Sequence, residues 1–397
     1  MVIRKSSLLV ALLIAPWFTF ALGLKWPLLG VLINICRVMG IGFALLHLLR
    51  SERIRRNFFS NSYLIPMGIL YGMLFISTII NGKNISDAIQ LAMYGFWPFV
   101  VLSLLNTKKE VGNVFLEGIV ISFSALIIIN LILMLAYSDG IYTTYTSATV
   151  TKYYLFGAKN QAVAPLMTAL IFFVEYSLGM YNRVTCPIFL LCTLCIIEII
   201  MAGSGTGILM VALFIILCFY QIWKARNISS TVTIFVVLGL TVGLVILRIQ
   251  NWFDFIIVSI LHKSLTLSDR IYIWDAALET IRAYPWIGTG VSESLAGDVL
   301  LNLSYLSKNT FAHNMVLDFL VMGGWSTLVS FLAILYVTKR YYDNSIAVLK
   351  DGKSCIWIGV ILYLIASIVE IYTGNYCLFL MMAYIVSLPK VECDNIK

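Results

Sequence analysis

The chain has 397 residues, of which 61% are hydrophobic and only 12% are charged, and its mean hydropathy is +0.95. A soluble domain of this length needs far more charge to cover its surface, so the composition excludes an ordinary soluble fold. The net charge of +8 does not indicate nucleic-acid binding, because the cations lie mostly in short connections between apolar runs.

Twelve apolar runs follow one another along the chain, and most are long enough to cross a bilayer as a helix. They cover 7–24, 27–48, 63–81, 87–105, 114–136, 160–181, 186–203, 206–222, 229–249, 313–338, 354–372 and 376–389. We therefore expect an all-α polytopic membrane protein with about twelve transmembrane helices in a single domain, 1–397. The first run resembles a signal peptide but lacks a clean cleavage site, so we expect a retained helix.

The lysines and arginines divide unequally between the two sides of the predicted helices. Seventeen of the 27 fall in one set of connections and nine in the other, with Arg37 inside a run. Because short cytoplasmic loops carry the excess of cations, we expect both termini in the cytoplasm. Two long connections, 137–159 and 250–312, then face outward, and the larger one lies between the ninth and tenth predicted helices.

The larger outer loop contains an amphipathic segment. Ile271, Trp274, Leu278 and Ile281 recur at helical spacing, which predicts a helix at the outer membrane surface that ends near Pro285. Arg270 and Trp274 are one turn apart and share a face of it. Taken singly, such an arginine more often anchors a helix, and such a tryptophan is more often an interface aromatic.

His313 stands where this loop re-enters the membrane. A histidine beside cations at an outer interface suits proton transfer, although a single interfacial histidine is more often a structural hydrogen-bond donor. The outer loops lack a DxD-type motif, and the one Cys-x-x-Cys, Cys192 with Cys195, has no partner pair. We therefore expect no metal and no cofactor.

The order of these features resembles the O-antigen ligase and O-antigen polymerase superfamily of bacterial envelopes. The shared pattern is an arginine, an aromatic residue four positions on, a Pro-x-x-Gly-x-Gly turn, and a His-Asn that opens a helix carrying Gly-Gly. In this sequence these residues are Arg270, Trp274, Pro285, Gly288, Gly290, His313, Asn314, Gly323 and Gly324. The resemblance is sharpest over 150–330.

The resemblance implies an enzyme of the bacterial inner membrane that joins glycans on the periplasmic side. Its substrates would be oligosaccharides on undecaprenyl diphosphate, both as donor and as acceptor. Arg270 matches the arginine expected to hold the donor diphosphate, and His313 matches the histidine proposed to activate the acceptor hydroxyl. Trp274 and Asn314, in the same motifs, are expected to contact substrate.

The sequence departs from the ligase pattern at one position. Ligases usually carry an arginine in a turn after the seventh span, and Gly205 occupies that position here. A second contact to the diphosphate would have to come from another cation on the outer side. The candidates are Lys152, Lys159, Arg248 and Arg282.

We therefore expect a polymerase of lipid-linked repeat units that makes O-antigen, capsule or exopolysaccharide. The alternatives are a ligase that moves the finished glycan onto lipid A-core, and a polysaccharide-related transporter without catalysis. The expected partners are the lipid-linked donor and acceptor, membrane lipid and a chain-length regulator protein, and not nucleic acid.

Three acidic residues lie near the outer ends of predicted spans, namely Glu198, Asp318 and Glu370. Charges at membrane depth are costly, so they tend to face a bundle interior or a wet cavity. They either line the acceptor path and orient His313, or pair with Arg37 or the backbone.

Overall fold

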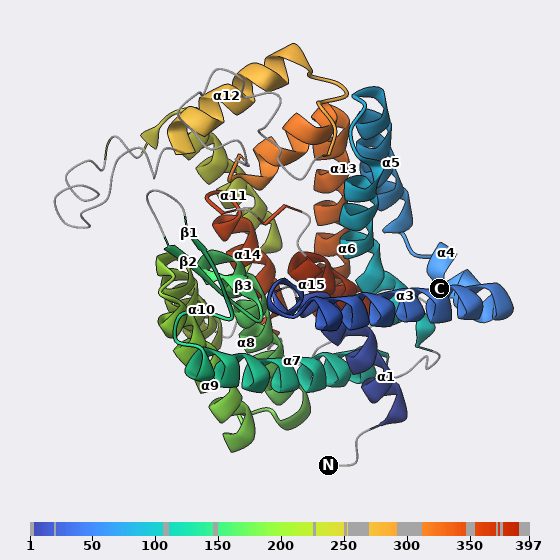
Figure 1. The fold of residues 1–397 in the computed structure, drawn as a ribbon, viewed down its shortest axis with the longest axis vertical. Coiled ribbons are helices and arrows are strands. Elements are labelled where there is room, and N and C mark those ends of the chain that lie inside the picture. Colours follow the sequence, from blue (N-terminus) through green and yellow to red (C-terminus); the bar gives the residue numbers. More distant parts are fainter. Residues whose placement is uncertain are drawn as a thin grey trace.

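The computed structural model describes residues 4–19, 21–105, 111–145, 150–224, 228–249, 252, 270–291, 312–346, 354–370, 372–373 and 376–388, and these are mostly helical (Figure 1). The helices are α1 (Lys5–Ile14), η1 (Ala15–Phe18), α2 (Leu22–Lys25), α3 (Pro27–Arg50), α4 (Glu52–Phe59), α5 (Leu64–Ile80), α6 (Ile85–Leu104), α7 (Val111–Ala136), α8 (Lys159–Tyr181), α9 (Cys186–Ala202), α10 (Gly205–Lys224), α11 (Ser230–Val245), α12 (Arg270–Ala283), α13 (Met315–Ile346), α14 (Ile356–Ala366) and α15 (Tyr376–Ser387). Most of the larger outer loop, including 253–269 and 292–311, lies outside the described residues.

The described helices support a polytopic membrane protein. Five of them, α3, α6, α7, α8 and α13, are long and apolar enough to cross a bilayer, or six spans if the bent pair α4 and α5 counts as one. Six shorter apolar helices occupy the remaining predicted runs. The twelve crossings, the cytoplasmic termini and the outward loops stay predictions.

Two of the predicted spans have different helical bounds in the structure. The first run is divided into α1 and the short 3-10 helix η1 at Pro16, because proline disrupts the hydrogen bonding of a continuous α-helix. The carbonyl of Pro16 instead accepts two hydrogen bonds from Arg37, at 3.0 and 2.9 Å. In the 354–372 run, α14 ends at Ala366, so Glu370 lies beyond the helix.

The outer loop at 137–159 is not merely a polar connection, because it forms a three-stranded antiparallel sheet. Its strands are β1 (Tyr142–Tyr145), β2 (Val150–Tyr154) and β3 (Gly157–Ala158), in the order β1-β2-β3. Tyrosine, threonine and valine favour such pairing. The amide of Leu155 donates to Asn130 Oδ1 of α7 at 3.0 Å, which attaches the sheet to the helices beside α8 (Figure 1).

A glycine contact determines where α12 lies. Helix α13 is broken at Gly324, whose φ of 71° and ψ of −166° are not helical. The turn after α12 packs into this break, where Thr289 N donates to Val321 O at 2.8 Å and Trp325 N donates to Pro285 O at 2.9 Å. The glycines of the family pattern therefore have a structural role, because they allow two backbones to approach closely.

Helix α12 lies across one end of the molecule, over the first part of α13 (Figure 1). It buries Trp274, Ala277 and Ile281 against apolar residues of α13 such as Leu317 and Leu320. Two residues of the predicted apolar stripe, Trp274 and Ile281, are thus buried, and the contact sets the position of Arg270 at the start of the helix.

We expect Gly324→Ala to destabilise the protein. An added Cβ would lie 2.4 Å from the backbone oxygen of Trp286, and a φ of 71° with ψ of −166° is a conformation almost restricted to glycine, which costs an alanine on the order of 1–3 kcal/mol. Thermal unfolding of the purified protein in detergent should show a clear drop in Tm. Gly72→Ala in α5 is the control, because its Cβ would have no neighbour within 4 Å. Equal shifts for the two variants would contradict this account of the glycine contact.

Candidate functional site

Arg270 lies beside a buried carboxylate that comes from a distant part of the chain. Its Nη2 is 3.3 Å from Oε1 of Glu370, which follows α14. The side chain of Arg270 is 19% exposed and that of Glu370 is 5% exposed. The guanidinium of Arg270 therefore remains accessible to a ligand. Its position is fixed by the buried carboxylate of Glu370.

Glu370 also connects two other segments to this ion pair. Asn160 Nδ2 donates to both carboxylate oxygens at 3.2 Å, and Thr206 Oγ1 donates to Oε1 at 2.9 Å. Asn160 is itself oriented by Ser204, whose hydroxyl donates to Asn160 Oδ1 at 3.0 Å, and by Tyr372, whose hydroxyl donates to the Asn160 carbonyl at 3.2 Å. The start of α8, the α9–α10 turn and the start of α12 thus meet at one carboxylate.

His313 lies between Ala312 and the start of α13, in a segment that is fixed on several sides. Trp274 Nε1 donates to the Ala312 carbonyl at 2.9 Å, and the Ala312 amide donates to Asp318 Oδ1 at 3.1 Å. The hydroxyl of Thr373 donates to the other Asp318 oxygen. Asp318 therefore orients the residue before His313 rather than the imidazole itself.

The imidazole of His313 is partly buried and uncharged near neutral pH. Burial, and then the positive charge of Arg270, lower the pKa of His313 from its usual 6.5 to about 4, so the ring is neutral near pH 7. Nδ1 has no hydrogen-bond partner among the described residues. Trp274, one turn after Arg270 on α12, binds the residue before His313, so α12 holds the two ends of the larger loop on neighbouring segments.

Two site residues adopt a left-handed backbone conformation that is costly for side chains other than glycine. These are His313, with φ of 51°, and Arg248, with φ of 52°; the third such residue in the described part of the chain is Asn182, at the end of α8. Asparagine is common in this conformation at helix ends, whereas strain at His313 and Arg248 costs on the order of 1–3 kcal/mol each. Such strain concentrates at functional sites.

Arg248, one of the four candidate cations, also contacts α12. It forms an ion pair with Asp275, and its guanidinium carbon lies 5.7 Å from the centre of the Trp274 ring. Its Nη1 is buried and has no hydrogen-bond partner among the described residues. Arg248 is therefore the candidate cation that the described contacts bring closest to the Arg270 end of α12.

The other candidate cations lie elsewhere. Arg282 is exposed and is twelve residues along α12 from Arg270, which corresponds to about 18 Å of helix. Lys152 on β2 is paired with Asp139 at 2.9 Å, and it lines a cavity with Lys159 beside the sheet. The structure thus groups Lys152 with Lys159, and places Arg282 apart from both groups.

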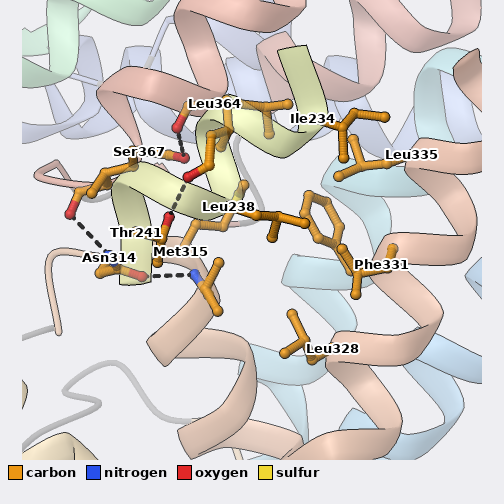
Figure 2. A pocket seen from close by; sticks show the side chains of 14 residues that line it. Ile234, Leu238, Thr241, Asn314, Met315, Leu328, Phe331, Leu335, Leu364 and Ser367 are labelled. Carbon is orange, nitrogen blue, oxygen red and sulfur yellow. Dashed lines mark hydrogen bonds between the residues drawn. The ribbon is translucent and has the colours of Figure 1, made fainter. Parts of the chain in front are cut away.

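Asn314 caps α13, with its amide occupied by the protein. Its Oδ1 accepts hydrogen bonds from the amides of Val316 and Leu317, and its Nδ2 donates to Ile368 O at 3.0 Å. Figure 2 shows the contacts of Asn314 with Val316 and Ile368 at the edge of an apolar crevice between α11, α13 and α14. Its apolar lining includes Ile234, Leu238, Leu328, Phe331, Leu335 and Leu364. In the described contacts Asn314 has a structural role, and a contact of this residue with substrate stays a prediction.

Comparison with known proteins supports the resemblance. A family model described as O-antigen ligase matches residues 189–332. This match supports the O-antigen ligase and polymerase superfamily. A general O-oligosaccharyltransferase of Acinetobacter baylyi (strain ATCC 33305 / BD413 / ADP1) is 29% identical over 117 residues, which cover 26% of this chain and only 20% of that relative.

The part of the chain that matches the superfamily model contains most of the residues described at the site. It includes Arg270, Trp274 and His313, and it ends soon after the break in α13. Asn160 and Glu370 lie outside it. At the turn where ligases usually carry an arginine, the residue after Gly205 is Thr206, and its hydroxyl reaches Glu370. The α9–α10 turn therefore still contributes to the site, because Thr206 binds Glu370 and Glu370 forms the ion pair with Arg270.

Several of these contacts could not be anticipated from the sequence pattern. Glu370 was recognisable as a costly acid in an apolar run, but its partners come from positions 100 or more residues away. Thr206 and Asp275 carry no signal of their own. The suggested pairing of Glu198, Asp318 or Glu370 with Arg37 is wrong for the described contacts. Arg37 instead binds the Pro16 carbonyl and Asn34.

We expect the imidazole of His313 to titrate near pH 4 and to shift upward in Arg270→Gln, because the repelling charge is removed. Nitrogen NMR of histidine-labelled protein in detergent measures this, with His313→Gln assigning the signal. Because the folded pKa lies below the unfolded value of about 6.5, this group makes stability decrease as pH falls from 6.5 towards 4. A pKa near 6.5 that does not respond to the Arg270 change would contradict the described environment.

We expect Glu370→Ala to reduce glycan transfer by about tenfold or more, because Arg270 loses the carboxylate that positions it. Thr206→Val removes one hydrogen bond to that carboxylate and should cost less, a few-fold at most. Glu52→Ala is the control, since Glu52 is exposed and pairs only with Arg56 in the described contacts. Unchanged transfer in Glu370→Ala, with normal protein levels, would remove this role.

Proposed function

We propose that this protein transfers oligosaccharides from undecaprenyl diphosphate to a glycan acceptor on the outer side of the cytoplasmic membrane. The observation that carries the proposal is that α12 places Arg270 in its ion pair with Glu370 and also binds, through Trp274, the residue before His313, whose imidazole is neutral. The family-model match and the described apolar helices support the reaction class and the membrane setting.

The chemistry requires one cationic group and one base. A hydroxyl oxygen of the acceptor attacks the anomeric carbon of the donor and forms the new glycosidic bond. The bond between that carbon and the diphosphate oxygen breaks, and the diphosphate leaves with its negative charge. His313 takes the proton of the attacking hydroxyl. Attack opposite to the leaving group inverts the anomeric carbon, so a retained configuration in the product would contradict this step.

Arg270 would bind the diphosphate. A guanidinium has five N–H donors in a rigid fork, and the contact with Glu370 leaves donors for phosphate oxygens. Because Glu370 holds the group before substrate arrives, little reorganisation is needed as charge develops on the leaving group. Arg248, with its buried and unpartnered Nη1, is the candidate for the second contact.

The low pKa of His313 fits a base whose strength depends on the donor. In the protein alone, burial and Arg270 together disfavour the protonated ring. A bound diphosphate would offset the charge of Arg270 and so raise the pKa of His313 towards neutral pH. The imidazole would become a stronger base when donor is present.

Polymerisation of lipid-linked repeat units is the specific activity that we favour. Gly205, where ligases usually carry an arginine, is the observation that supports it. Transfer of a finished glycan to lipid A-core is the second candidate, supported by the matched O-antigen ligase model and by the similarity to an oligosaccharyltransferase. A polymerase would also work with a chain-length regulator.

Deletion of the gene tests both the reaction and its type. Loss of long chains, with single repeats still attached to the core, is expected for a polymerase, whereas loss of all attachment would identify a ligase. On re-expression, His313→Ala and Arg270→Ala should each lower chain extension on the order of 100-fold or more. Glu279→Ala, an exposed position on the same helix, serves as control. Full activity in both variants at normal membrane levels would disprove the catalytic assignment.

A further inference from the structure

The cavity lined by Lys152 and Lys159 lies between the sheet at 142–158 and helices α7, α8 and α9. It has a volume of about 360 Å³, which is within the range of pockets that bind small molecules. Its polar lining includes Asn130, Ser138, Thr151, Lys152, Lys159 and Glu198. Neither the ion pair of Arg270 nor the imidazole of His313 lines it.

Glu198 has an unsatisfied oxygen at this cavity. The residue is 0% exposed, and its Oε2 accepts a hydrogen bond of 2.6 Å from Asn130 Nδ2. Its Oε1 has no partner among the described residues. A buried acceptor without a donor is costly, so a ligand that brings hydrogen-bond donors to this cavity would gain affinity.

Asn130 determines the direction of the carboxylate. Its Oδ1 accepts from the amide of Leu155 at 3.0 Å, so its Nδ2 is directed to Glu198. Leu155 follows β2, and the sheet therefore orients Asn130 and, through it, Glu198. These contacts orient the carboxyl group of Glu198 and leave its Oε1 as the oxygen available to a ligand. The group is therefore positioned for binding before a ligand arrives.

The cavity is adjacent to the proposed reaction site. Lys159 and Ala202 line it. Asn160 follows Lys159, Ser204 lies two residues after Ala202, and both belong to the hydrogen-bond network around Glu370. Asn160 is 3.2 Å from Glu370, and Ser204 donates to Asn160. The first turn of α8 and the α9–α10 turn thus separate the two sites, and a substrate of several sugar rings can contact both.

We infer that this cavity is a subsite for one uncharged sugar ring of the glycan, whose hydroxyl groups donate to Glu198 and accept from Lys159. This inference rests on the proposed function and adds a specificity determinant to it. A carboxyl group and an amine can both form hydrogen bonds with the hydroxyl groups of a sugar ring. Because the subsite is remote from the reacting bond, it controls which glycan binds.

Binding of the free oligosaccharide repeat unit, released from the organism's own glycan by mild acid, tests the inference. Saturation-transfer NMR with purified protein in detergent reports binding without requiring catalysis. Glu198→Gln, which is nearly isosteric, and Ala202→Phe, which fills the cavity from the end of α9, should each weaken binding about tenfold or more. Glu52→Gln on the exposed surface should not change it.

The two hypotheses fail in different ways. His313→Ala should still bind the oligosaccharide although it no longer transfers it. Oligosaccharide binding that is absent in the unmodified protein, or equal in Glu198→Gln and Ala202→Phe, would overturn the subsite, whatever happens to transfer. Full glycan transfer by His313→Ala would instead overturn the proposed function. The subsite would then still be tested by the oligosaccharide-binding comparison of Glu198→Gln and Ala202→Phe with the unmodified protein. If Glu198→Gln does not accumulate in the membrane, Ala202→Phe decides.

Discussion

The contact between Arg270 and Glu370 is the interaction on which the candidate site depends. It joins α12 to a carboxylate that is also bound by the start of α8 and by the α9–α10 turn. Removing one member of a buried pair leaves an uncompensated charge, which typically costs about 3–5 kcal/mol. The buried carboxylate of Glu370 is stable only because Arg270 and its hydrogen-bond donors offset its charge. The same contacts position Arg270, the cation that the proposed chemistry needs.

A second constraint brings the imidazole to that cation. The turn after α12 inserts into the break of α13, and Trp274 binds the carbonyl of Ala312. The superfamily pattern therefore contains two kinds of residue. Its glycines and tryptophan hold α12 over the start of α13, while Arg270 and His313 supply the proposed chemistry. The strained backbone at His313 agrees with this division, because the surrounding contacts must maintain it.

The sequence predicted the helices well, because long apolar runs have few alternatives in a membrane. It also singled out Arg270 and His313, whose order carries the family pattern and whose roles stay predictions. It did not predict the sheet at 137–159, where short polar strands lack a strong periodicity, and it placed Glu370 inside a helix that ends earlier. Thr206, the partner of Glu370, and Asp275, the partner of Arg248, are brought to the site only by tertiary contacts. The length of α12 places Arg282 far from Arg270, and Asn314 caps α13.

The most direct measurement of the central claim is release of undecaprenyl diphosphate by the purified protein in lipid vesicles that contain lipid-linked oligosaccharide. The account predicts one diphosphate released for each glycan bond formed, with release lost in His313→Ala and Arg270→Ala and unchanged in Glu279→Ala. Donor binding should remain in His313→Ala and weaken in Arg270→Ala. Glycan transfer at the unmodified rate by both variants, at equal protein levels in the vesicles, would contradict the account.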